Sequence, residues 1–561
     1  MIQNSQAKSK HRTVLALQSL FAVGAFCFSA YLQTSHALSP ITRDDVRSAE
    51  RLFDLEFTEA KRDSVLDRLG ELRSKYQRLR LVPIAKSTPP AMVFNPIPAG
   101  FRFPQKPGLF ELSSLDKVEV PGRDEDLAYY SVRRLAELLR TRKVTSTQLT
   151  RLALERLKRF DPVLLCTVTL LEERALQQAH RVDEEIASGK YRGPLHGIPY
   201  GAKDLLATKG IRTTWGSAVY KDQVPDRDAT VIKRLEEAGA ILVAKFSMGE
   251  LAMGDVWFGG MTRNPWNVTE GSSGSSAGSA AATAAGLVPF AIGTETWGSI
   301  ISPSTRCGTT GLRPSYGRVS RTGAMALSWS MDKIGPICRT VEDCALVFNA
   351  IYGPDGVDQT VYDVPFSYSP GLELRELRLG YVKSAFDSAT ATDRAVLDRL
   401  RSLGARLIPI ELPKLPVMDC SIILSAEAAA AFDDLTRSGK DDLLVQQTKD
   451  SWPNEFRGSR MIPAVEYLQA NRVRYMLIQE MDKLMNMVDC YVAPSSDDAN
   501  LLLTNLTGHP CVVLPNGFSQ QGTPTSISFI GRLFDEGVLL AVAKKYQDAT
   551  DFHLKHPPLF P

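Results

Sequence analysis

One stretch of the chain constrains the fold more than any other. Residues 271–286 are Gly, Ser or Ala at every position except Thr283. Such a composition often indicates a flexible linker. Here, however, residues 280–285 are strongly helix-forming and Gly286 is suited to end a helix. The apolar run 287–292 follows and predicts a buried strand. The stretch therefore predicts a tight loop that leads into a helix and then into the core.

This loop and the turn after the predicted strand are both rich in serine. A loop that enters a helix leaves backbone N–H groups unpaired beside its serine hydroxyls, which suits the binding of an anion or an oxyanion. The second turn, residues 293–299, ends at Ser299. Because ligands of open α/β sheets bind beyond the carboxyl ends of strands, Ser299 lies where a nucleophile is expected.

A serine nucleophile needs a base, and histidine is the usual one. Two of the seven histidines lie in the first 37 residues, and the other five have no recognisable triad motif. These five are His180, His196, His509, His553 and His556. A lysine can serve instead if burial lowers its pKa enough to leave it neutral. Lys203, bracketed by apolar residues at a predicted strand end, is the candidate, although taken alone it would equally fit a lysine that extends to solvent.

Helices and short apolar strands alternate from about residue 126 onwards. Asp228 precedes a helical pattern that stops at Gly239 and leads into the strand 241–246. Near the C-terminus, residues 526–529 alternate like a strand, and a closing helix runs to Tyr546. This alternation predicts an α/β sheet.

Together, these segments resemble the amidase signature family, whose members use a Ser-Ser-Lys triad. The segments that carry the resemblance are 197–204 (GIPYGAKD), 213–217, 245–254, 264–267 (NPWN), 271–320 and 505–517. The resemblance covers about residues 126–555. It implies one large α/β domain with a central mixed β-sheet flanked by helices.

The resemblance also implies residue roles. Lys203 matches the base, Ser275 the bridging serine, which has a cis peptide bond in the family, and Ser299 the nucleophile. In this scheme neutral Lys203 takes the proton of Ser275, Ser275 takes that of Ser299, and Ser299 attacks the amide carbonyl to give an acyl-enzyme. Backbone N–H groups would stabilise the oxyanion, and no metal or organic cofactor is needed. These N–H groups belong to Thr296, Trp297, Gly298 and Ser299.

The sequence departs from the family pattern close to the nucleophile. The family commonly has Asp-Thr-Gly-Gly-Ser-Ile-Arg, whereas this chain has Glu-Thr-Trp-Gly-Ser-Ile-Ile at 295–301. The ring of Trp297 is expected to reshape the acyl pocket and to make it partly apolar. Ile301 removes a guanidinium, and Ala277 replaces a glycine of the serine loop. The family's substrates are therefore not transferable to this chain.

The first 37 residues have the layout of a signal peptide. Lys8, Lys10 and Arg12 precede an apolar run, and a small-x-small pattern ends at Ala37. These three cations account for the whole net charge of +3, so a nucleic-acid partner is not expected. We expect an exported protein, periplasmic or secreted, without stable membrane association. If the leader were not cleaved, it would anchor the protein in a membrane.

Residues 38–125 form a predicted N-terminal extension before the domain at 126–555. Thr58 is a suitable N-cap for an amphipathic helix, and seven prolines between residues 83 and 107 predict an extended segment. Eight cysteines without a CxxC motif exclude a disulfide-dense scaffold and a zinc ribbon.

Three alternatives to a free-standing amidase stay open. One is the A-type (glutaminase) component of a glutamyl-tRNA(Gln) amidotransferase, a branch of the same family, against which the leader and the extension argue. Another is an α/β-hydrolase-type serine esterase, because Gly274–Gly278 fits G-x-S-x-G with Ser276 as nucleophile; no hydrophobic strand is expected at 263–270 to precede it. The third is a non-catalytic amidase-like binding protein, although the three triad residues are retained. The expected ligand is a small-molecule amide, and the oligomeric state is left open.

Overall fold

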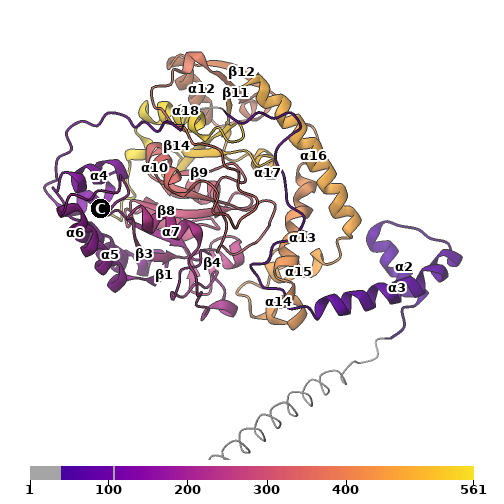
Figure 1. The fold of residues 1–561 in the computed structure, drawn as a ribbon. Coiled ribbons are helices and arrows are strands. Elements are labelled where there is room, and N and C mark those ends of the chain that lie inside the picture. Colours follow the sequence, from indigo (N-terminus) through magenta and orange to yellow (C-terminus); the bar gives the residue numbers. More distant parts are fainter. Residues whose placement is uncertain (1–38, 105–107) are drawn as a thin grey trace, which may run out of the picture. The chain divides into compact units, whose positions relative to one another are not determined.

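The computed structural model describes residues 39–104 and 108–561 (Figure 1). The predicted leader, residues 1–37, lies outside the described residues. The chain divides into two units, Met1–Ile84 and Ala85–Pro561. Among the described residues, no helix combines the length and the apolar character that a membrane span requires. The predicted boundary near residue 125 stays a prediction.

The described part of the first unit is a pair of helices, α2 (Arg43–Phe53) and α3 (Glu59–Arg80). The Thr58 side chain accepts a hydrogen bond from the backbone N–H of Lys61, which confirms the predicted cap of α3. Arg62 of α3 forms an ion pair of 2.8 Å with Glu50 of α2. This contact joins the two helices within the unit.

The second unit contains a mixed sheet of eleven strands, in the order β1-β3-β2-β8-β10-β9-β14-β15-β13-β11-β12. Strand β2 runs parallel to both β3 and β8, whereas β10 is antiparallel to β8. The predicted α/β fold with a central mixed sheet is confirmed. In chain order the strands are β1 Thr167–Leu170, β2 Pro199–Lys203, β3 Ile241–Phe246, β8 Phe290–Glu295, β9 Thr310–Arg313, β10 Lys333–Cys338, β11 Arg378–Val382, β12 Arg406–Ile410, β13 Cys490–Pro494, β14 Cys511–Phe518 and β15 Pro524–Gly531.

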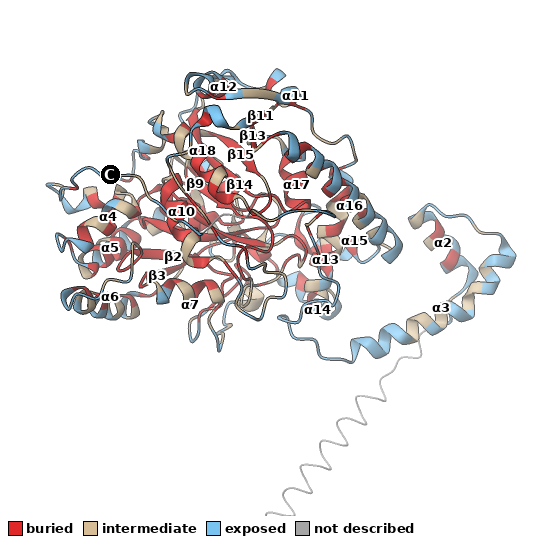
Figure 2. Ribbon diagram, turned by 45° about the horizontal axis from the view of Figure 1, so that its top comes forward, coloured by how far each residue is buried: buried red, intermediate tan, exposed pale blue. Residues whose placement is uncertain are grey.

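Helices surround this sheet (Figure 1). Helix α10 packs against β10 and α18, and Figure 2 shows that buried residues are concentrated in the central strands of the sheet and in the helices next to them, whereas the edge strands β1 and β12 are mostly only partly buried or exposed. The helices are α4 Val132–Arg140, α5 Ser146–Leu164, α6 Glu172–Ala187, α7 Thr230–Glu237, α8 Ala277–Ala284, α9 Ile301–Cys307, α10 Val341–Ile351, α11 Lys383–Asp387, α12 Ala391–Ser402, α13 Ile422–Ala431, α14 Asp433–Ser438, α15 Trp452–Ser459, α16 Ala464–Met487, α17 Asp498–Leu506 and α18 Glu536–Asp548.

The Gly/Ser/Ala stretch forms the predicted loop and helix. Helix α8 ends in a Schellman motif, in which the N–H of Leu287 donates to the carbonyl of Ala282 at 2.9 Å and Gly286 takes a φ of 65°. The predicted strand bounds of 287–292 are wrong by three residues, because β8 begins after Pro289, which has no N–H to donate to a ladder. As a result, Glu295 is the last residue of β8.

The prediction that no strand precedes the serine loop is also wrong. Two short strands, β6 (Arg263–Asn264) and β7 (Asn267–Gly271), pair with each other there. They lie outside the eleven-stranded sheet, and four of the five residues of β7 are partly buried while Thr269 is exposed. The nucleophile elbow needs a hydrophobic strand of the main sheet, so Ser276 still lacks the context of an elbow.

Candidate active site

Strand β2 delivers Lys203 into the interior of the molecule. It lies between β3 and β8, all five of its residues are buried, and Lys203 is its last residue. The Nζ atom lies 2.8 Å from the Oγ of Ser275, 3.1 Å from the Oγ of Ser276 and 2.9 Å from the Oγ1 of Thr294. Three hydroxyl groups therefore surround an amine that water does not reach.

This burial changes the protonation of Lys203. Loss of solvation lowers its pKa from the usual value near 10.5 to about 7, while the carboxylates of Asp332 and Glu295 act in the opposite direction. A large fraction of Lys203 is therefore neutral at physiological pH and able to accept a proton. The alternative of a lysine that extends to solvent does not fit this structure.

Ser275 lies between Lys203 and Ser299. Its Oγ is within 2.8 Å of the Lys203 Nζ and within 3.0 Å of the Ser299 Oγ. The peptide bond between Gly274 and Ser275 is cis, as the family resemblance implies. The structure thus brings the three predicted residues into one continuous hydrogen-bonded chain.

Two glycines allow the serine loop to pack this closely. A Cβ on Gly274 would lie 1.7 Å from the carbonyl oxygen of Gly254, and one on Gly278 would lie 2.3 Å from that of Cys166. Both neighbours are backbone atoms that cannot rotate away, so no larger residue fits at either position. Ala277, which replaces a family glycine, is accommodated as the first residue of α8.

Ser299 belongs to the loop that connects β8 to α9. The carboxylate of Glu295 holds this loop: its Oε2 accepts hydrogen bonds from the backbone N–H groups of Ile300 at 2.8 Å and Ile301 at 2.9 Å. Its Oε1 accepts from Arg313 at 2.8 Å and from Asn505 at 2.9 Å. One buried carboxylate therefore fixes the start of α9 directly after Ser299.

Replacing Glu295 with glutamine is expected to destabilise the fold strongly. Every partner of this carboxylate is a donor, so the amide N–H₂ of glutamine would face donors, and Arg313 would lose its counter-charge in the interior. Breaking a buried ion pair from one side costs about 3–5 kcal/mol of unfolding free energy. Urea denaturation of E295Q against the wild type measures this loss.

Glu270→Gln is the matched control. The pair between Glu270 and Arg306 has side chains that are 40% and 49% exposed. Exposed pairs contribute about 1 kcal/mol or less. Equal losses in the two variants would contradict the role assigned to Glu295.

The four predicted oxyanion donors lie on the same loop, where Gly298 has a φ of 83°. The hydroxyl of Thr296 donates to Asp332 at 2.6 Å and ties the loop to the segment before β10. Trp297 does not line the cavity described below, and neither does Ser299, so the expectation that the Trp297 ring reshapes the acyl pocket stays a prediction. This half-buried ring packs against the hydrophobic cluster that contains Ile301 and Leu501.

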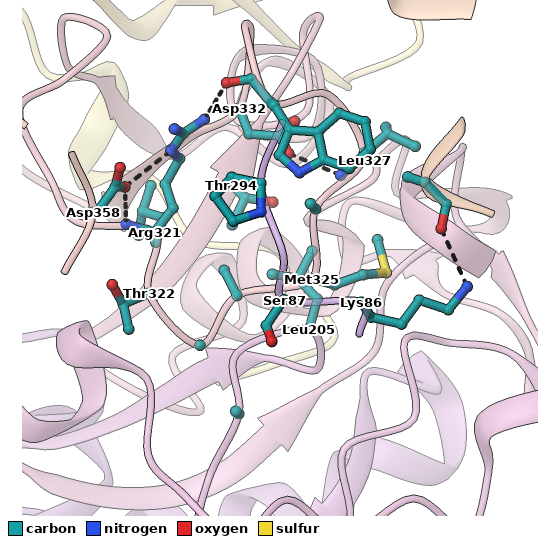
Figure 3. A pocket seen from close by; sticks show the side chains of 18 of the residues that line it. Lys86, Ser87, Leu205, Thr294, Arg321, Thr322, Met325, Leu327, Asp332 and Asp358 are labelled. Atoms are coloured by element: carbon teal, nitrogen blue, oxygen red, sulfur yellow. Dashed lines mark hydrogen bonds and ion pairs between the residues drawn. The ribbon is translucent and has the colours of Figure 1, made fainter. Parts of the chain in front are cut away.

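A cavity of about 770 Å³ lies next to the end of β8, and Thr294 and Thr296 are among the residues that line it (Figure 3). Arg321 of this lining is already engaged, because it pairs with Asp358 at 3.2 Å and donates to the carbonyl of Trp329 at 2.6 Å. Asp332 likewise accepts from two backbone N–H groups. With these two charges satisfied internally, the part of the cavity that they line is best suited to an uncharged and partly apolar group, whereas Asp226 and Arg227 of the lining are exposed.

Three residues of the site were not predicted from the sequence. Ser276 and Thr294 surround the Lys203 amine, and Glu295 holds the nucleophile loop. The sequence indicates Ser276 only as a competing nucleophile, whereas in the structure its Oγ also donates to the carbonyl of Thr294 at 3.0 Å. An acidic residue at the end of an apolar strand, directly before a small polar turn, was the available signal for Glu295.

A large mixed sheet with a buried lysine at the end of β2, and two serines in the loops before α8 and after β8, defines an α/β enzyme with a site for nucleophilic chemistry. The chain belongs to the amidase family, because the family model described as Amidase matches residues 148–540. It is accordingly an amide hydrolase of that family.

Individual relatives extend this result. The chain is 36% identical over 477 residues to the A-type component of the glutamyl-tRNA(Gln) amidotransferase of Methylococcus capsulatus, covering 75% of this chain and 98% of that protein. The native peptide amidase of Stenotrophomonas maltophilia has a TM-score of 0.69 and 28% identity, over 76% of this chain and 98% of that one. A chain from a vestigial protein complex, described as revealing the origins of an s-triazine catabolic enzyme, has a TM-score of 0.70 and 27% sequence identity. The match covers 75% of this chain and 98% of that one.

Proposed function

We propose that this protein hydrolyses a carboxylic amide through an acyl-enzyme on Ser299. Neutral Lys203 takes the proton of Ser275 while Ser275 takes that of Ser299, and the Ser299 Oγ bonds to the amide carbon. The tetrahedral oxyanion is stabilised by the backbone N–H groups of the loop 296–299, each worth about 3 kcal/mol. The proton returns through Ser275 to the leaving nitrogen as the C–N bond breaks. Water then hydrolyses the ester to free the acid.

One observation carries this proposal. The hydrogen-bonded chain from Lys203 through Ser275 to Ser299 is buried, and its lysine has a pKa of about 7. A relay of this kind needs an acceptor that is neutral at working pH, and few buried amines meet that condition. The retained relay argues against a non-catalytic binding protein. The engagement of Ser276 with Lys203 and Thr294 argues against a separate Ser276 nucleophile.

A second candidate function is that of a glutaminase within a larger amidotransferase. The relative of Methylococcus capsulatus, named as the A-type component of a glutamyl-tRNA(Gln) amidotransferase, is matched over 98% of its length. Against this assignment stand the leader-like residues 1–37, from which we propose export to the periplasm or the medium. Partner proteins are part of this second candidate only.

Hydrolysis by the purified chain alone separates the two candidates. We expect ammonia or amine release from simple amides, peptide amides and acyl anilides without any added partner protein or ATP. The assay quantifies released ammonia or chromophore over a panel of amides, with glutamine included. Glutamine cleavage that occurs only after addition of a B-type partner would instead support the amidotransferase assignment.

A further inference from the structure

Residues 86–94, which precede the region matched by the family model, line the same cavity as the catalytic loop (Figure 3). Figure 3 labels Lys86 and Ser87 of this segment together with Leu205 and Met325 from the core. The segment is called the strap below. Thr294 and Thr296 also line this cavity, and Thr294 contacts the Lys203 amine at 2.9 Å. The cavity therefore reaches the neighbourhood of the triad, although Lys203, Ser275 and Ser299 themselves do not line it.

The upstream end of the strap is fixed by Lys86. Its Nζ forms an ion pair with Asp434, donates to the carbonyl of Ala431 at 3.2 Å and lies 5.0 Å from the centroid of the Phe432 ring. The cation–π contact with Phe432 and the ion pair with Asp434 both hold the Lys86 ammonium, although solvent weakens the partly exposed ion pair. This end is therefore attached to α13 and α14.

The downstream end is fixed by Phe94. Its ring meets Tyr316 edge to face, with centroids 5.0 Å apart, and the guanidinium carbon of Arg474 lies 3.4 Å from its centroid. Arg474 is fully buried and also donates to the carbonyl and hydroxyl of Ser330 at 2.8 and 2.7 Å. The same guanidinium therefore connects the strap to the loop before β10.

Between these ends the backbone is stiff and its side chains are apolar. Pro89 and Pro90 have fixed φ angles and bias the chain towards an extended form. Met92 and Val93 line the cavity and are nevertheless 66% and 51% exposed. Apolar side chains left exposed at the edge of an apolar cavity gain stability when a ligand covers them.

The opposite side of the cavity is also largely apolar. Leu205, Met325 and Leu327 face it, and all three are buried. Among its charged groups, Arg321 and Asp332 are occupied by partners within the protein, whereas Asp226 and Arg227 are exposed. An apolar, proline-containing segment held at both ends therefore faces an apolar floor across this cavity.

We propose that the strap completes the substrate pocket and selects amides whose uncharged, apolar group is compact enough to fit beneath it. This inference rests on the proposed function, because it places the substrate at Ser299. It names residues outside the family-matched region as determinants of specificity. Lys86 and Phe94 act here by holding the strap, and they do not touch the reacting atoms.

The test releases either end of the strap, with K86A or F94A, and compares a compact with a bulky fluorophosphonate that both label Ser299. We expect the ratio of bulky to compact labelling rates to rise about tenfold in each variant. Lys383→Ala is the control, because its exposed i,i+4 pair with Asp387 lies on α11 and outside the cavity lining. An unchanged ratio in both released variants would overturn the proposal.

A second readout does not depend on Ser299. The seven described cysteines are buried, so a thiol introduced by Met325→Cys can be followed by maleimide alkylation of the peptide that contains residue 325, in a parent chain that carries Cys27→Ser. We expect a bulky maleimide to react several-fold faster after release of the strap, while the Lys383→Ala rate stays at the parent value. Absence of Ser299 labelling in the wild-type chain would refute the proposed function alone, whereas an unchanged alkylation rate would refute the strap.

Discussion

Ser299→Ala is expected to abolish amide hydrolysis, with a fall in kcat of about 10⁴- to 10⁶-fold. The variant removes the only oxygen that forms the acyl bond, while Ser275 and Lys203 keep their own hydrogen bond of 2.8 Å. The fold should be unaffected, because Ser299 contributes one small, buried hydroxyl. Steady-state hydrolysis of the best amide of the panel, together with a thermal melt, measures both expectations.

Covalent labelling identifies the nucleophile directly. A fluorophosphonate should add its mass to the peptide that contains Ser299, and the adduct should be absent in S299A. Ser388→Ala is a matched control, because Ser388 is exposed and its hydroxyl donates only to the nearby carbonyl of Ala385. An adduct on Ser276, or labelling that persists in S299A, would contradict the assignment and favour the elbow mechanism.

The sequence predicts most of the framework of this site. The Gly/Ser/Ala stretch, the apolar strand after it and Lys203 at a strand end give the elements and their order, because local composition sets turns and periodicity sets burial. The distance between Lys203 and the two serines depends on how β2 and β8 pair in the sheet, which local composition does not determine. The family resemblance supplied the roles of Ser275 and Ser299, which local pattern alone does not distinguish from Ser276.

Other parts of the site depend on long-range contacts that a single sequence does not reveal. Glu295 accepts hydrogen bonds from Arg313 and from Asn505, and Asn505 lies 210 residues further along the chain than Glu295. The strap likewise precedes Lys203 by more than a hundred residues and meets its cavity only through the tertiary fold. The packing of the Trp297 ring is a further example, since the hydrophobic cluster that it joins contains residues such as Leu501 from far along the chain.

The acid limb of the pH–rate profile should report the pKa of Lys203. Only the neutral amine accepts the proton of Ser275, so kcat/KM should rise about tenfold per pH unit below pH 7 and level off above it. Burial sets this midpoint, because it lowers the pKa of Lys203 to about 7. In Lys203→Ala the rate should fall by about 10²- to 10⁴-fold, and this limb should be lost.

The variant Asp332→Asn tests whether Lys203 is the group whose titration produces the acid limb of the pH–rate profile. The negative charge of Asp332 raises the pKa of Lys203, so Asp332→Asn should move the midpoint to lower pH. Asp387→Asn removes an equal charge from an exposed pair on α11 and should leave the midpoint in place. A limb centred near pH 10 would show that Lys203 is protonated in the resting enzyme. If Asp332→Asn leaves the midpoint unchanged, the titrating group is not Lys203. The reason is that the loss of this negative charge lowers the pKa of Lys203, and that pKa sets the pH at which the rate rises.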